Sequence, residues 1–438
     1  MYLYFKMKLL FVILDGLGDR PCGALKGRTP LEAASTPNLD FFARKGKCGL
    51  MYPIAKSIAP ESDAAISAIL SYDPLKHYCG RGPLEAYGLG IRIKEGQLAL
   101  RCNFATLEKG TLTSRRAGRT LTTKEGNELA EHLNKHLKFD DPKVSFRFEH
   151  STEHRAVLII KASKKLSRNI SNTDPGYKVE EKFGVAERKV EPTVYMCVPL
   201  DKSEASVYSA ELVNEFMEKS YALLRNHGIN KTREKKGLDP ANVILTRDAG
   251  NFLPKFKTLK QKYELNFASI VGMPLEIGLT KLAGIKVLSF KYPELKRRDV
   301  RAHLFDELAT EIKYSKIYLN KYWNTFDAFY IHFKETDIPG HDGLPKEKRK
   351  MIEMIDKEFF SWITEQKLDA LICVTADHCT PCETKAHSAD PVPLLIYSPS
   401  LKPDKVKRFG ESECKEGSLG MVKGINLLAM LRKIGGLK

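Results

Sequence analysis

Carboxylate and imidazole side chains follow a buried strand near the end of the chain. Asp377 and His378 stand directly after the apolar run Ala370 to Val374, which is short, β-rich and bounded by polar residues, as a buried parallel strand is. A second imidazole, His387, follows nine residues after His378. Carboxylate oxygen and imidazole nitrogen are a mixed metal-ligand set. Because ligands bind at the carboxyl ends of strands in open α/β sheets, the pattern predicts a metal site there.

Two further apolar runs end in the same residue types. Leu9 to Leu14 is followed by Asp15, and Phe326 to Phe333 is followed by Asp337 and His341. These groups are too many for one ion, whereas two ions about 3.5–4 Å apart would accommodate them and would suit phosphoryl transfer. Taken singly, each aspartate after a strand is as well explained as a helix N-cap or a turn residue. The repetition at three strand ends favours the metal centre.

A serine stands at the start of an expected helix. Pro60-Glu61-Ser62-Asp63 precedes an alanine-rich apolar stretch that runs to Leu70. The backbone N–H groups and the dipole at a helix N-terminus favour a phosphate. From the local sequence alone, Ser62 is equally well explained as an N-cap. In the company of the metal ligands, we interpret it as an activated nucleophile.

The elements that position these residues are expected to form two α/β domains. From about Gly96 short β-like runs replace the longer apolar ones, with a helical segment over 123–137. We expect a discontinuous core, 1–90 and 205–438, with a smaller α/β domain inserted at 91–204. Strands are expected at 242–246, 267–271 and 286–290 in the core, and a charged loop at 231–237. The insert carries arginine-rich segments at 115–119 and 154–155, which suit bidentate binding of phosphate or carboxylate but also fit a solvated charge run.

The amino-acid composition limits the classes of protein to which this chain can belong. The 438 residues are 42% hydrophobic, which indicates a globular chain, and the formal net charge is +17. Lysine is spread over many segments, and neither a nucleic-acid motif nor an apolar stretch of roughly 20 residues occurs. We therefore expect neither nucleic acid nor a membrane as partner; the positive charge is compatible with an anionic small substrate, although the total charge alone does not show one. The nine cysteines are odd in number and irregularly spaced, which predicts free thiols in the cytoplasm. Cys379-Thr-Pro-Cys382 resembles a redox or zinc pair without a second pair to complete it.

Several of these motifs together resemble one family, the archaeal type of 2,3-bisphosphoglycerate-independent phosphoglycerate mutase, within the alkaline phosphatase superfamily. The resemblance runs from about residue 8 to the C-terminus, and it is most specific around 377–393. The motifs that carry it are Ile13-Leu14-Asp15-Gly16, Pro60-x-Ser62-Asp63, Gly80-Arg81-Gly82-Pro83, Arg115-Arg116-Ala117-Gly118-Arg119, Glu153-His154-Arg155, His341-Asp342-Gly343 and Thr375-Ala376-Asp377-His378.

The resemblance implies a fold, a reaction and a set of site residues. The fold would be an alkaline-phosphatase-like, mostly parallel sheet flanked by helices. The reaction would interconvert 3-phosphoglycerate and 2-phosphoglycerate through a phosphoserine on Ser62. Two divalent ions, Mn²⁺ first and Co²⁺, Zn²⁺ or Mg²⁺ as alternatives, would be bound. One would take Asp15, Ser62, Asp377 and His378, and the other Asp337, His341 and His387. The candidates for substrate binding are Arg81, Arg115, Arg116, Arg119, His154, Arg155 and Lys334.

Three positions depart from the family pattern. Glu61 and Asp248 stand where the family usually has glycine, and Ser114 stands where an aspartate commonly precedes the arginine pair. An anionic Glu61 beside a phosphate site is expected to weaken binding, to shift the strand-to-helix turn, or to point to solvent. The alternatives are another phosphotransferase or phosphatase of the superfamily, such as a homoserine kinase, and a basic, non-catalytic protein that binds nucleic acid. The product formed from 3-phosphoglycerate and the salt dependence of nucleic-acid binding separate them.

Overall fold

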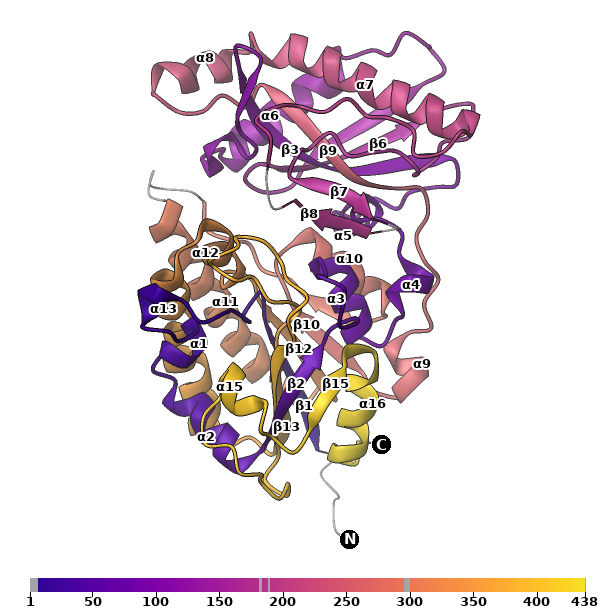
Figure 1. Ribbon diagram of the computed structural model, residues 1–438. Helices are drawn as coiled ribbons and strands as arrows, with labels where there is room; N and C mark the ends of the chain where they lie inside the picture. Colours follow the sequence, from indigo (N-terminus) through magenta and orange to yellow (C-terminus); the bar gives the residue numbers. More distant parts are fainter. Residues whose placement is uncertain (1–6, 181–182, 188–189, 295–299, 438) are drawn as a thin grey trace.

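An eight-stranded sheet forms the centre of the larger domain (Figure 1). The computed structural model describes residues 7–180, 183–187, 190–294 and 300–437. In spatial order the strands are β11 (Lys286–Leu288), β10 (Phe267–Ile270), β12 (Ala328–Phe333), β1 (Lys8–Leu14), β13 (Ala370–Thr375), β14 (Val392–Tyr397), β2 (Lys47–Tyr52) and β15 (Gly420–Lys423). All neighbours pair in parallel except that β14 is antiparallel to both β13 and β2. The expected mostly parallel sheet is confirmed.

Helices cover both faces of this sheet (Figure 1). One face carries α1 (Pro30–Ala33), α2 (Pro37–Lys45), α11 (Val300–Tyr322), α13 (Pro345–Ile355) and α14 (Ser361–Gln366), and the other α3 (Ser62–Ile69), α10 (Pro274–Leu282) and α16 (Gly424–Gly435). Shorter helices complete the domain: α4 (Pro74–His77), α5 (Arg81–Gly88), α9 (Leu259–Tyr263), α12 (Asp337–Asp342) and α15 (Glu411–Cys414). The central strands β1, β12 and β13 are buried almost throughout, which explains their continuous apolar sequences.

The smaller domain has its own sheet and its own core. Its main strands are β3 (Gln97–Glu108), β4 (Thr111–Ser114), β5 (Ser145–His150), β6 (Arg155–Lys161) and β9 (Val243–Gly250), and a separate hairpin consists of β7 (Tyr177–Glu180) and β8 (Phe183–Ala186). Its helices are α6 (Thr123–His136), α7 (Glu204–Leu224) and α8 (Gly228–Lys235). In Figure 1 this domain lies above the larger one.

The expected boundary of the insert at residue 204 needs correction. β9 pairs with β3 in the smaller sheet, and α7 contributes Val213 and Phe216 to the core of the smaller domain. The strand at 242–246 was therefore assigned to the wrong sheet, and we propose that the insert extends to about residue 250. The expected charged loop at 231–237 is also wrong, since most of it lies in α8. Only Asn230 and Arg233 of α8 are buried, so this helix has no apolar stripe to reveal it.

In the part of the chain that the structure describes, no helix is long and apolar enough to cross a membrane.

Candidate metal and phosphoryl-transfer site

The ends of β1 and β13 and the start of α3 bring four donor atoms together. Nε2 of His378 lies 3.2 Å from Asp15 Oδ1, 3.3 Å from Asp377 Oδ2 and 3.2 Å from Ser62 Oγ. All four residues are buried. These are the four residues that the family resemblance assigns to one ion.

The turn after β1 fits closely against the other strand ends. Gly16 has φ +59°, and a Cβ at this position would lie 2.6 Å from both Asp337 Oδ1 and Thr380 Oγ1. Its backbone N–H donates to Asp377 Oδ1 at 3.1 Å. Below this turn, the buried ammonium of Lys348 donates to Asp19 Oδ2 and to the carbonyl of Thr380. The close approach that Gly16 allows, together with the buried ion pair of Lys348 and Asp19, therefore holds together the segments that carry Asp15 and His378.

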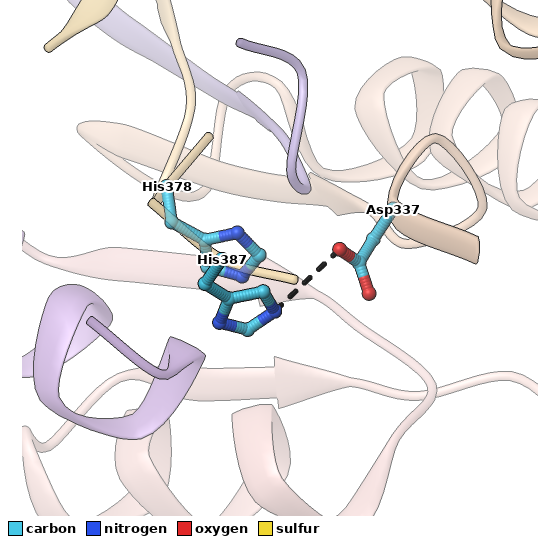
Figure 2. Close-up of side chains that lie close together, drawn as sticks. All are labelled: Asp337, His378 and His387. Carbon is cyan, nitrogen blue, oxygen red and sulfur yellow. Dashed lines mark ion pairs between the residues drawn. The ribbon is translucent and has the colours of Figure 1, made fainter. Parts of the chain in front are cut away.

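A second set of donors lies beside the first. Nε2 of His341 is 3.2 Å from Nε2 of His387 and 3.3 Å from Asp337 Oδ2, and Nε2 of His387 is 3.7 Å from Asp337 Oδ1. Figure 2 shows Asp337 facing the rings of His378 and His387, which stack with centroids 3.7 Å apart. The two sets are therefore neighbours. The outer nitrogens also have partners: Nδ1 of His341 lies 3.0 Å from the carbonyl of Lys385. Such contacts orient an imidazole for metal binding.

The charges of the aspartates in these two sets, and the carboxylate oxygens that lack hydrogen-bond donors, suit the binding of divalent cations. Burial raises the pKa of Asp15, but the Lys334 ammonium together with contacts from His332 and His378 brings the net pKa well below the usual range. Burial likewise raises the pKa of Asp337, but His341, His378 and His387 together lower it well below the usual range, so that both carboxyls are ionised. Asp15 Oδ1 and Asp377 Oδ2 are buried, and neither has a hydrogen-bond partner among the residues that the structure describes. Buried carboxylate oxygens that lack donors, beside imidazoles, suit Mn²⁺ or Zn²⁺.

An arginine-rich cavity opens from Ser62 toward the insert. Five of the candidate substrate residues line it: Arg81, Arg116, His154, Arg155 and Lys334. The other two, Arg115 and Arg119, line an adjoining outer cavity of about 680 Å³. Arg119 donates two hydrogen bonds to Asp342 of the larger domain, at 2.8 and 3.1 Å. Four of the seven candidates therefore line only the inner cavity, two line only the outer cavity, and Arg116 lines both.

Sequence reasoning missed several residues of the inner cavity. Glu85 accepts hydrogen bonds from Arg81 Nε at 2.6 Å and from Arg101 Nη1 at 2.5 Å, so one buried carboxylate orients two guanidinium groups. Arg247 lies over the ring of Tyr177, 3.6 Å from its centroid. A single arginine within each of two strands could have pointed to these residues: Arg101 in β3 and Arg247 in β9. A charged residue in a buried strand requires a partner.

The three departures from the family pattern all have local partners. Glu61 is buried, and its Oε1 lies 3.2 Å from His387 Nδ1, so the expectation that it points to solvent is wrong. Ser114 accepts a hydrogen bond from the N–H of Gly118 at 2.9 Å and so shapes the arginine turn. Asp248 adopts φ +53°, a conformation that favours glycine, and accepts a 2.6 Å hydrogen bond from Arg247.

Comparison with known proteins gives a consistent result. The family model described as 2,3-bisphosphoglycerate-independent phosphoglycerate mutase matches residues 43–230. The Aeropyrum pernix protein named 2,3-bisphosphoglycerate-independent phosphoglycerate mutase is 39% identical over 427 residues, which cover 95% of this chain and 97% of that protein. The solved cofactor-independent phosphoglycerate mutase of Thermoplasma acidophilum is 31% identical, with a TM-score of 0.54, over 98% of this chain and all of that one. A solved Pyrococcus horikoshii protein is 29% identical, with a TM-score of 0.72, over 99% of this chain and 98% of that one.

Proposed function

Because this chain belongs to the family of 2,3-bisphosphoglycerate-independent phosphoglycerate mutases, we propose that it interconverts 3-phosphoglycerate and 2-phosphoglycerate through a phosphoserine on Ser62. Because it belongs to this family, the protein is an enzyme, namely an isomerase that moves a phosphoryl group within its substrate. The observation that carries the phosphoserine step is the convergence of Ser62 Oγ, Asp15 Oδ1 and Asp377 Oδ2 on His378 Nε2, at 3.2 to 3.3 Å.

Two divalent ions complete the proposal. Asp15, Ser62, Asp377 and His378 would hold one, and Asp337, His341 and His387 the other, with Mn²⁺ the first expectation and Co²⁺, Zn²⁺ or Mg²⁺ alternatives. When bound, such ions neutralise charge that develops on phosphoryl oxygens and lower the pKa of a coordinated hydroxyl.

In the first half of the reaction Ser62 Oγ attacks phosphorus, its P–O bond forms, and the bond from phosphorus to the glycerate oxygen breaks. The hydroxyl proton of Ser62 passes to solvent and the released glycerate oxygen takes one from solvent, so that this half of the reaction changes no net proton count. In the second half the other glycerate hydroxyl attacks, and the bond to Ser62 breaks. Ser62 is the first residue of α3, whose N-terminal N–H groups favour a phosphate.

Glycerate must stay bound while it turns between the two halves. The inner cavity supports this retention, because Arg81, Arg116 and Arg155 lie on its wall and the intermediate glycerate carries a carboxylate. His154 lies there too, and burial, followed by the charges of Arg155 and Arg116, lowers its pKa well below the usual value. A neutral imidazole can accept the proton of a substrate hydroxyl, which is the role that we propose for His154.

A coupled assay tests the proposal. Metal-reconstituted protein should form 2-phosphoglycerate from 3-phosphoglycerate at the same rate with and without added 2,3-bisphosphoglycerate. Release of inorganic phosphate, or transfer to homoserine, in place of 2-phosphoglycerate would assign the site to another phosphotransferase or phosphatase reaction.

A further inference from the structure

The carboxylate of Asp15 faces two groups of donors. Its Oδ1 points to His378 Nε2, in the set described above, while its Oδ2 lies 3.2 Å from Nε2 of His332. His332 comes from β12, which pairs with β1 and places His332 opposite Ile13. Glu276, from the first turn of α10, completes this other group. Neither His332 nor Glu276 has a task in the proposed mutase reaction.

The atoms of this group are buried, and three of them make no hydrogen bond within the described residues. Glu276 is 2% exposed, and neither of its carboxylate oxygens has a hydrogen-bond partner among the described residues. His332 is 3% exposed, and its Nε2 has Asp15 Oδ2 as an ion-pair partner at 3.2 Å but makes no hydrogen bond there. One ligand atom each from Asp15, Glu276 and His332 lie within 4.8 Å of one another. Buried carboxylates without donors are costly unless a cation neutralises them.

From this geometry we propose that Asp15, Glu276 and His332 bind a third divalent cation, next to the ion at Ser62 and sharing Asp15 with it. Two carboxylates and one imidazole form a mixed oxygen and nitrogen set, which suits Mn²⁺ or Zn²⁺ better than Ca²⁺. The imidazole is already oriented, since its Nδ1 lies 3.0 Å from the hydroxyl of Tyr330. With the Nδ1 hydrogen directed to Tyr330, the lone pair of Nε2 faces the two carboxylates.

The ammonium of Lys334 competes for the same carboxylate. Its Nζ contacts Asp15 Oδ2, and Lys334 also lines the inner cavity. A cation bound to Asp15 Oδ2 takes over the neutralising role of Lys334 and frees this ammonium to face the cavity. The third ion therefore changes the charge that faces the substrate cavity by freeing Lys334.

Counting bound ions tests the proposal without reference to catalysis. Chelated full-length protein is dialysed against Mn²⁺, and bound manganese per chain is measured by mass spectrometry for the wild type and for Glu276→Gln. The variant should hold one ion fewer. Glu411→Gln is the matched control: Glu411 accepts hydrogen bonds from Asp19 N and Thr29 Oγ1, away from this group, and its variant should match the wild type. Lys334→Met should bind the third ion more tightly, by about tenfold or more.

The test remains decisive if Glu276→Gln does not fold, as judged by circular dichroism, because His332→Gln removes a different ligand and should lose the same ion. Equal manganese counts in the wild type and in either folded variant would overturn the proposal, and would mean that Lys334 alone neutralises the group. If the two-ion centre of the proposed function were wrong, the wild-type count itself would fall, whereas the difference of one ion between wild type and Glu276→Gln would persist. The two failures are therefore distinguishable.

Discussion

Glu61 Oε1 lies 3.2 Å from His387 Nδ1, so the residue before the proposed nucleophile contacts a ligand of the second metal set. A carboxylate behind a metal-binding imidazole fixes the ring and raises its basicity. Arg81 Nη1, 3.6 Å away, partly balances the charge of Glu61. The glutamate that replaces the usual glycine thus supports the proposed metal centre in place of disturbing it.

Replacing Glu61 with glutamine should weaken Mn²⁺ binding at the second set. Burial lowers the pKa of His387, but Glu61 raises it to about 10, so a proton competes with the ion at neutral pH. Wild-type affinity should therefore rise with pH and exceed that of Glu61→Gln by roughly tenfold only above about pH 10, where the imidazole is free of its proton, with a smaller difference at lower pH. Manganese titrations at several pH values measure this. Glu264→Gln, at an exposed site, should behave as wild type, and equal affinities of wild type and Glu61→Gln at the highest pH would contradict the prediction.

Ser62→Ala should abolish turnover and leave the fold intact. The N-cap of α3 is Glu61 and not Ser62, so loss of the hydroxyl should not remove a cap, a change that would cost about 1 kcal/mol. Turnover, phosphoprotein mass after incubation with substrate, and metal content should be measured on one preparation. Ser67→Ala removes a hydroxyl from the same helix, one that donates to the carbonyl of Asp63, and should stay active. Retained turnover in Ser62→Ala would exclude the phosphoserine mechanism.

Chelation should abolish activity reversibly. The ligands of both sets come from segments far apart in the chain, and imidazole and carboxylate ligands bind divalent ions reversibly. Treatment with EDTA followed by dialysis should remove turnover, and Mn²⁺ or Co²⁺ should restore it. Full activity in protein whose metal content is below one-tenth of an ion per chain would rule out the metal-dependent mechanism.

Arg116→Ala should damage substrate handling without loss of metal. Arg116 lines both cavities, and it forms no ion pair with any residue in the described ranges, so its guanidinium is available to an anion. Turnover should fall at least tenfold with metal content unchanged. Arg147→Ala is the matched control on the same domain, because Arg147 pairs with Glu149 at an exposed site. Loss of metal from Arg116→Ala would show that the insert has a different task.

Tyr177 should titrate near neutral pH. Burial raises the pKa of its phenol, but Arg247 and then Arg116 lower it to about 7, against about 10 in the unfolded chain. Between these values the unfolded state binds the extra proton, so Tyr177 adds stability as pH rises from about 7 to 10, and this contribution is lost as pH falls through 7. Tyrosinate absorbance should show one phenol ionising near pH 7 that is missing in Tyr177→Phe. Identical titrations of the two proteins would refute the assignment.

The sequence predicted the site best where a potential metal ligand directly follows an apolar strand pattern. Asp15, Asp337 and Asp377 each follow a buried run, and the parallel pairing of β1 with β12 and β13 brings these strand ends together. The sequence did not reveal the pairing partners of strands whose apolar patterns are weak and whose partners lie far away in the chain. β9 has a strand sequence, but nothing local shows that its partner is β3 and not the large sheet, because both edges offer the same backbone groups. Arg101, Arg247 and Glu276 were missed for a related reason: their significance comes from side chains that only the tertiary fold places beside them.

The central position of β1 has a consequence for the order of synthesis. This strand leaves the ribosome long before its two sheet neighbours, β12 and β13, which begin at residues 328 and 370. The nascent chain therefore carries an apolar strand with neither of these partners until residue 328 has been passed, and pairings of such sequence separation form slowly. His378 and His387 emerge later still. The two proposed ligand sets can therefore be complete only after residue 387 has been made.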